Sequence, residues 1–157
     1  MTNKTKVIIH CSDSEFGNAA IINEWHRQRG FYSVEQNISI GYHLVILNGK
    51  ISARCYNPRF DGRIETGRGF DEDNHIERWE HGAHTKGQNY SSLGICLIGK
   101  SGDFTNAQIR GLSKELRELR IQFGQLDIGQ HSDYSKSKPF CAGFTEKQMR
   151  ELKRIGL

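Results

Sequence analysis

The stretch Val7-Ile8-Ile9-His10-Cys11-Ser12 decides the fold, because a short apolar run that ends on a histidine reads as a buried strand. A second stretch, His131 to Cys141, lies near the other end of the chain and follows no helical pattern. His10, His131 and Cys141 together offer two imidazoles and a thiolate. Three protein ligands leave a tetrahedral zinc ion one open position, which distinguishes a catalytic zinc from a structural one.

The length and composition describe one globular unit. We expect a single domain over residues 1–157, since 36% hydrophobic and 25% charged residues are ordinary for a soluble protein. The apolar run Leu44-Val45-Ile46-Leu47 is far too short to cross a bilayer. Met1 to Lys6 is polar and lacks the apolar core of a secretory signal peptide. We therefore expect synthesis in the cytoplasm, with no membrane anchor.

Charge and cysteine content narrow the partners. The net charge of +4 is modest and suits a partner with an anionic surface, such as a bacterial envelope. None of the four cysteines forms a C-x-x-C pair, so a four-cysteine zinc site and a thioredoxin-like motif are disfavoured. In a reducing cytoplasm we expect free thiols. Cys96 lies in an apolar run and is expected in the core.

The order of the elements indicates an α/β fold with a central mixed β-sheet flanked by helices. Asn48-Gly49 and Asp61-Gly62 are predicted to form turns, and Gly67 to Asn89 reads as a long loop of the kind that is usually functional. Strands are predicted over residues 6–10, 42–47, 50–55, 63–66, 92–98 and 126–128, and helices over 18–30, 105–124 and 145–155.

Taken alone, a histidine at the end of a buried strand is more often a core residue than a ligand. The combination carries more weight, because an ordered set of motifs across residues 6 to about 155 resembles the zinc-dependent N-acetylmuramoyl-L-alanine amidases of the short phage-lysozyme type, relatives of the peptidoglycan recognition proteins. The matching blocks are Ile9-His10-Cys11-Ser12, Trp25-His26, Gly41-Tyr42-His43, Ile64-Glu65-Thr66-Gly67-Arg68, Gly82-Ala83-His84-Thr85-Lys86-Gly87-Gln88-Asn89, Ser92-Leu93-Gly94-Ile95-Cys96-Leu97-Ile98-Gly99, His131-Ser132-Asp133 and Cys141-Ala142-Gly143-Phe144.

The resemblance implies roles for individual residues. It assigns His10, His131 and Cys141 as ligands of Zn²⁺, which would activate water and polarise the scissile carbonyl. Tyr42 would guide a proton, and Lys138 would stabilise the oxyanion. Lys138 stands three residues before Cys141, whereas the family's lysine usually stands two before, so Lys136 remains a rival.

Further residues are placed by the same resemblance. His84 and Asn89 belong to a loop that in relatives lines the groove for the peptide stem, and we expect them to contact substrate. In a second branch of the family a catalytic glutamate stands where this chain has Cys96, so the chain is expected in the branch that uses tyrosine. His43 alternates with Tyr42 along a strand and is expected to be structural. Residues 48–60 look like an insertion, which would shape the groove or be peripheral.

The implied function is hydrolysis of the amide bond between N-acetylmuramic acid and L-alanine in peptidoglycan. Such a protein would be a phage or prophage endolysin that waits in the host cytoplasm and reaches the wall through a holin pore. We expect a monomer whose partner is the muropeptide stem, with no nucleic-acid partner. Two alternatives remain: a peptidoglycan-binding module without activity, which usually lacks the cysteine ligand, and a phage regulatory protein that acts on RNA polymerase.

Overall fold

A five-stranded mixed β-sheet forms the centre of the protein. It is seen in a computed structural model that describes residues 2–157. The strand order is β4-β3-β6-β2-β7, and a separate two-stranded ribbon pairs β1 with β5. The strands are β1 (Thr2–Asn3), β2 (Lys6–Cys11), β3 (Leu44–Ser52), β4 (Cys55–Thr66), β5 (His75–Ile76), β6 (Ser92–Leu97) and β7 (Asp127–Gln130). The helices are α1 (Ala19–Gln28), α2 (Asn106–Phe123) and α3 (Glu146–Lys153), with 3₁₀ turns at Arg78–Glu80 and His131–Asp133.

Four of the five strands run in parallel. β2 pairs in parallel with β6 and β7, and β3 pairs in parallel with β6, while β4 is antiparallel to β3. The predicted α/β fold with a mixed sheet is therefore confirmed. Parallel strands are covered on both faces, which explains why Val7, Ile8 and Ile9 are all fully buried. The carboxyl ends of β2, β6, β7 and β3 consequently point toward one edge of the sheet.

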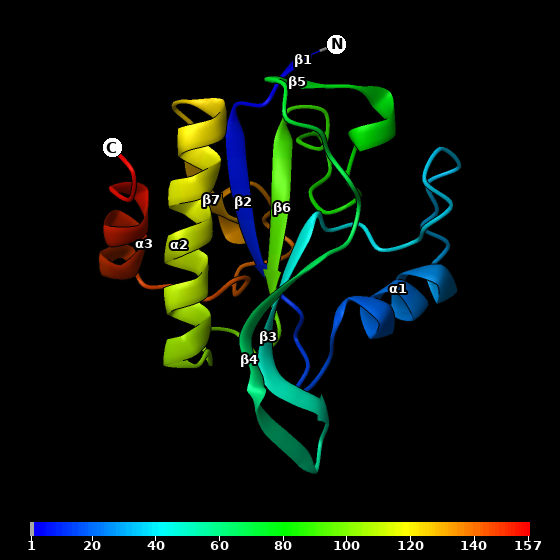
Figure 1. Cartoon of the computed structure of the whole chain (residues 1–157), viewed down its shortest axis with the longest axis vertical. Coiled ribbons are helices and arrows are strands. Elements are labelled where there is room, and N and C mark those ends of the chain that lie inside the picture. The colour runs from blue at the N-terminus through cyan, green and yellow to red at the C-terminus, as the bar shows by residue number, and fades with distance from the viewer. Residues whose placement is uncertain (1) are drawn as a thin grey trace.

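Side chains alternate between the two faces of the sheet, and each face packs into its own hydrophobic core. One core joins the sheet to α2 and α3, and it contains Val7 and Ile9 together with Leu112 and Leu116 of α2. The smaller core lies under α1 and contains Ile22 together with Val45, Cys96 and other side chains of the opposite face. Figure 1 shows α2 and α3 on one side of the sheet and α1 on the other. His10 alternates with Ile9 and so faces the α1 side.

The three predicted helices are confirmed, and a side chain caps the start of each. The Asn18 side chain accepts the backbone N–H of Ile21 at 2.8 Å. Thr105 and Thr145 each form a capping box with the glutamine three residues later, Gln108 and Gln148. These local bonds satisfy backbone donors that a helix start leaves without partners, and for that reason the helix starts were readable from the sequence.

Two predicted turns are wrong. β3 runs through Asn48-Gly49 to Ser52, the chain reverses at residues 53–54, and β4 continues through Asp61-Gly62 to Thr66. Gly49 and Gly62 both have positive φ, but the register shifts between β3 and β4 show that the hairpin accommodates irregularities along its length. A glycine with positive φ fits a β-bulge as well as a two-residue turn, and this ambiguity caused the error.

A buried lysine ties the N-terminal segment to the long loop of residues 67–89. The ammonium of Lys4 is fully buried and lies 3.1 Å from a carboxylate oxygen of Glu80, which is also fully buried. It donates to the carbonyl oxygen of Asp73 at 2.7 Å as well. Removing one partner of such a pair would leave an uncompensated buried charge, so the pair resists opening. The loop that carries His84 is thereby held against the sheet.

Candidate metal centre and cleft

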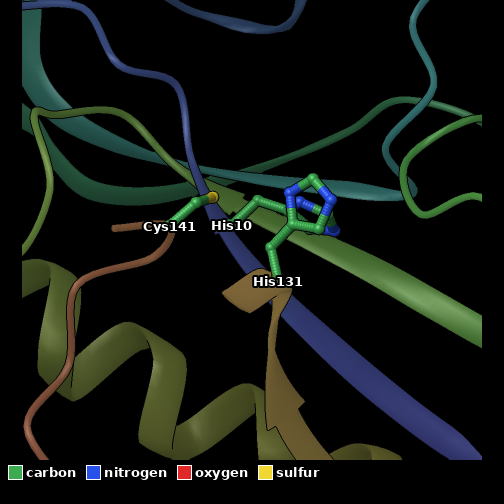
Figure 2. A group of neighbouring side chains, drawn as sticks. All are labelled: His10, His131 and Cys141. Atoms are coloured by element: carbon green, nitrogen blue, oxygen red, sulfur yellow. The ribbon is translucent and has the colours of Figure 1, made fainter. Parts of the chain in front are cut away.

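The three predicted metal ligands converge in the folded chain. A ring nitrogen of His10, a ring nitrogen of His131 and the sulfur of Cys141 all lie within 4.8 Å of one another. Figure 2 shows the side chains of the two histidines close together at the ends of their strands, with the cysteine sulfur beside them. No other group of this kind occurs among residues 2–157. The sequence hypothesis that these residues form one site is consistent with this geometry.

Strand pairing brings the two histidines together. Ile9 on β2 is the register partner of Gln130, the last residue of β7, so His10 and the residue that follows β7, His131, emerge at the same edge. Their ring centroids are 4.5 Å apart. The two histidines are separated by 120 residues of sequence, but they are close in space because their strands are parallel neighbours.

Cys141 is held by backbone contacts on both sides. The backbone N–H of Cys11 donates to its sulfur at 3.3 Å. The carbonyl oxygen of Cys141 accepts from the backbone N–H of Ser132 at 2.6 Å, and the carbonyl of Ala142 accepts from Gly102 at 2.9 Å. The sulfur is therefore fixed beside the two imidazoles. The neighbouring Cys11 thiol and burial raise the pKa of Cys141, an effect that the N–H of Cys11 only partly offsets, so the thiolate that a metal binds would be stabilised mainly by the metal itself.

The hydrogen bonds of His10 leave one nitrogen available for a metal. Its Nε2 lies 2.9 Å from Nδ1 of His84, while its Nδ1 is buried and finds no hydrogen-bond partner among residues 2–157. A buried nitrogen without a partner is costly, and a cation between the ligands would satisfy it. Two imidazoles and a thiolate are the ligand types that select zinc over magnesium or calcium. The residues present thus fit a Zn²⁺ ion.

The electrostatics keep both histidines uncharged. Burial lowers the pKa of His10 well below its usual value, and the neighbouring His84 and His131 lower it further. Burial also lowers the pKa of His131, with a smaller effect from the Lys138 ammonium. A metal binds the neutral imidazole, so these lowered pKa values leave both ligands in the form that binds near neutral pH.

A cleft of about 1050 Å³ is lined by His131 and Cys141, while His10 is buried behind them. Its walls come from the loop after β2, the end of α1, the 82–89 loop and the 131–141 segment. Asp13 is the one acidic residue of the cleft lining. Four basic residues line the cleft: Arg29, Lys86, Lys100 and Lys138. A cleft of this charge and volume suits an elongated anionic ligand.

Tyr42 lies inside this cleft beside the ligands. The centroid of its ring is 5.0 Å from that of His10 and 5.2 Å from that of His26. Burial raises the pKa of Tyr42 well above its usual value, and the nearby Cys96 and Cys141 thiols add to the shift. The phenol therefore stays protonated near neutral pH, and its ring lies beside that of His10.

The two candidate lysines differ in position. Lys138 lines the cleft, and its charge acts on the pKa of His131. Lys136 is exposed and is not part of the cleft lining. Both side chains are exposed, but only Lys138 lines the cleft, and its role toward a substrate stays a prediction.

His84 and Asn89 both line the cleft, but their contacts are internal. The ring of His84 is buried and bonds His10, and its Nδ1 also lies 3.0 Å from the hydroxyl of Thr85. Oδ1 of Asn89 accepts the backbone N–H groups of both His84 and Thr85 at 3.0 Å. Asn89 thus shapes the loop that holds His84 against the ligand His10, and the expected substrate contacts of this pair remain predictions.

Sequence reasoning missed one side chain of the cleft and judged another correctly. His26 was given no role, yet it lines the cleft and its Nδ1 accepts the backbone N–H of Gly41 at 2.9 Å, next to Tyr42. Its position beside Trp25 on the buried face of a helix was the available signal. His43 is structural as predicted: it is buried, its Nδ1 accepts the N–H of Gly94, and its Nε2 bonds the carbonyl of Glu80.

Comparisons with known proteins agree with this arrangement. The chain is 28% identical to an endolysin of Klebsiella phage KP32 over 161 aligned residues, which cover 96% of this chain and 88% of the relative. The solved N-acetylmuramoyl-L-alanine amidase LysC from Clostridium intestinale URNW superimposes with a TM-score of 0.71 at 23% identity, over 97% of this chain and 84% of that one. Bumblebee PGRP-SA superimposes with a TM-score of 0.67 at 18% identity, over 98% and 83% of the two chains. No model of a known protein family matches the sequence.

Sequence and fold point to the same class of protein. The chain is similar in sequence to phage endolysins over nearly its whole length, and it shares the fold of solved N-acetylmuramoyl-L-alanine amidases and peptidoglycan recognition proteins. Among residues 2–157, no helix combines the length and the apolar character needed to cross a bilayer.

Proposed function

We propose that this chain is a zinc-dependent N-acetylmuramoyl-L-alanine amidase that cleaves the bond between N-acetylmuramic acid and L-alanine in peptidoglycan. The observation that carries this proposal is the meeting of His10, His131 and Cys141 beside a basic cleft that His131 and Cys141 line. The phage endolysin that aligns with nearly the whole chain and the amidase of similar fold support it.

His10, His131 and Cys141 would hold the Zn²⁺ ion, which would supply a Lewis acid for the amide carbonyl and activate the attacking water. His84 would fix the ring of His10 through the contact at Nε2. Such second contacts to metal-bound histidines orient the ring and choose the nitrogen that binds the metal.

Tyr42 and Lys138 would act on the reacting groups. The phenol of Tyr42 is protonated and near His10, so it can donate a hydrogen bond at the site of attack and pass a proton toward the leaving nitrogen. The ammonium of Lys138 would stabilise negative charge on the carbonyl oxygen, an effect worth about 3 kcal/mol for a well-placed donor. Cys96 fills the position of the alternative glutamate and is fully buried, which leaves Tyr42 as the proton-transfer group.

A recognition module without activity would have no need of a complete ligand set. Because all three ligands converge and His10 Nδ1 lacks any other partner, the hydrolytic role is the better supported one. We also propose that the protein acts as a monomer on the muropeptide stem, and that it reaches the wall from the host cytoplasm through a holin pore.

The test uses purified sacculi and the purified full chain with Zn²⁺. We expect new L-alanine amino termini to accumulate, and we expect a chelator to abolish their release and added Zn²⁺ to restore it. Reducing-end sugars measured in the same digests distinguish an amidase from a glycosidase. Release of reducing ends without new amino termini would refute the proposal.

A further inference from the structure

The hairpin formed by β3 and β4 extends well beyond the rest of the sheet. Ile46 pairs with Leu97, the last residue of β6, but β3 continues to Ser52 before the chain turns back. Six more residues in an extended strand span about 20 Å. We call residues 48–63 the hairpin arm. Figure 1 shows the arm as a two-stranded projection that leaves the body of the protein.

The arm leaves the sheet at the edge where the metal ligands lie. β3 is parallel to β6, which is parallel to β2, so the carboxyl end of β3 points in the same direction as the end of β2 at His10 and Cys11. The base of the arm also contacts the loop that follows Cys11. The carbonyl of Lys50 accepts the N–H of Gly17 at 2.9 Å, and the side-chain amide of Asn48 donates to the carbonyl of Glu15 at 3.0 Å.

The arm is basic and its cations are unpaired. Its four basic residues are all exposed: Lys50, Arg54, Arg59 and Arg63. None of them forms an ion pair with a carboxylate among residues 2–157. Its one acidic residue, Asp61, accepts hydrogen bonds from the hydroxyls of Tyr56 and Thr105. Ile51 and Tyr56 add exposed apolar surface, at 45% and 54% exposure. None of the arm residues lines the cleft.

We propose that the hairpin arm binds polymeric peptidoglycan outside the cleft, through the carboxylates of neighbouring stem peptides and, at Tyr56, the faces of its sugars. The inference rests on the proposed function and deepens it. The cleft holds the unit that is cut, whereas a wall polymer repeats its carboxylates along every strand. Unpaired cations on a projecting ribbon at the cleft edge complement that repeated charge. A soluble fragment with one stem is too short to use both surfaces.

The experiment compares two double variants that lose the same charge. Arg54→Gln with Arg59→Gln changes the arm, and Lys114→Gln with Arg117→Gln removes two exposed cations from α2, outside the arm. Binding is measured by sedimentation with purified sacculi on ice. Activity is measured separately on a soluble disaccharide tripeptide that contains the muramoyl-alanine bond.

We expect the arm variant to bind sacculi about tenfold more weakly than wild type, and the α2 variant to bind within about twofold of it. The difference should disappear near 0.5 M salt, where surface charges are screened over about 4 Å. Both variants should cleave the soluble fragment at the wild-type rate. Equal sacculus binding by the two variants would overturn the proposal. So would an arm variant that loses binding to phosphatidylglycerol vesicles while its binding to sacculi is unchanged, because the arm would then contact a membrane.

Failure of the proposed function gives a different result. If wild type leaves the soluble fragment intact in the presence of Zn²⁺, the amidase assignment falls whatever the sedimentation shows. If wild type cuts the fragment but the arm variant binds sacculi normally, only the role of the arm falls.

Discussion

Nε2 of His10 and Nδ1 of His84 lie 2.9 Å apart, and the two rings meet edge to face with centroids 5.0 Å apart. A hydrogen bond between two neutral imidazoles needs one proton between the two nitrogens. If His10 provides it, Nδ1 of His10 is left unprotonated and able to bind a metal. In that tautomer the contact with His84 determines which nitrogen of His10 is available.

This contact leads to a prediction for zinc affinity. His84→Ala should weaken zinc binding by about 10- to 100-fold, because the ring of His10 loses the group that orients it. Competition with a chromophoric chelator measures the change directly, without reference to activity. His81→Ala is the control, since His81 is outside the cleft lining. Unchanged affinity in the His84 variant would show that His84 has no part in organising the metal centre.

The cysteine ligand can be tested against a second cysteine of the same chain. Cys141→Ala should lose both bound zinc and amidase activity, because only two of the three ligands remain. Cys55→Ala, which removes an exposed thiol from the turn of the hairpin, should retain both. Elemental analysis of each purified protein, with circular dichroism to verify folding, makes the comparison. Stoichiometric zinc in a folded Cys141 variant would contradict the ligand assignment.

Tyr42→Phe separates chemistry from metal binding. The substitution keeps the ring that packs against His10 and His26 and removes only the hydroxyl. We expect kcat to fall by about 10²-fold or more, while zinc content and affinity stay at the wild-type level. Steady-state rates on the soluble muropeptide, with zinc content measured on the same samples, test this. A fully active Phe variant would remove Tyr42 from the mechanism.

The two lysines of the 131–141 segment should behave differently. Lys138→Ala should lower kcat by about 10²-fold, since an oxyanion donor would be lost. Lys136→Ala should leave kcat close to that of wild type, because its side chain is exposed outside the cleft lining. Side-by-side kinetics on one substrate preparation decide between them. If the Lys136 variant were the slower one, the roles of the two residues would be exchanged.

Buried histidines predict a loss of stability in acid for the zinc-free protein. Burial lowers the pKa of His43 to about 4 from its usual value near 6.5. Between about pH 6.5 and 4, His43 binds a proton in the unfolded chain but stays neutral in the folded one. The free energy of unfolding is therefore highest above pH 6.5 and decreases as the pH falls toward 4. The loss from this group is about 3 kcal/mol.

Urea unfolding of the zinc-free protein at several pH values between about 7 and about 4 measures this effect. His43→Gln removes the titrating group, so the variant should show a flatter dependence on pH than wild type, whatever its absolute stability. Parallel pH profiles for the two proteins would exclude His43 as a source of acid sensitivity.

Much of the fold was predictable because its determinants are local. Helix starts at Asn18, Thr105 and Thr145 depend on capping bonds that span three residues, and a buried apolar strand before His10 is visible in a few letters. The turn of the hairpin was missed because Gly49 and Gly62 have the positive φ that both turns and bulges require.

Some features of the candidate site were also predictable from local sequence, and others were not. His10 and His131 each follow an apolar stretch, so their place at strand ends could be inferred. The His10–His84 contact could not, because it joins residues 74 positions apart and depends on how Asn89 folds the intervening loop. The choice between Lys136 and Lys138 depends on the path of an irregular segment, which no periodicity describes.

The pairing of β2 with β7 has a consequence for protein synthesis. His10 leaves the ribosome early, but its partners at positions 131 and 141 are translated only in the last fifth of the 157 residues. A nascent or prematurely terminated chain that ends before Cys141 holds an incomplete ligand set. If these three residues hold the metal as proposed, the site is completed only when nearly the whole chain has been made.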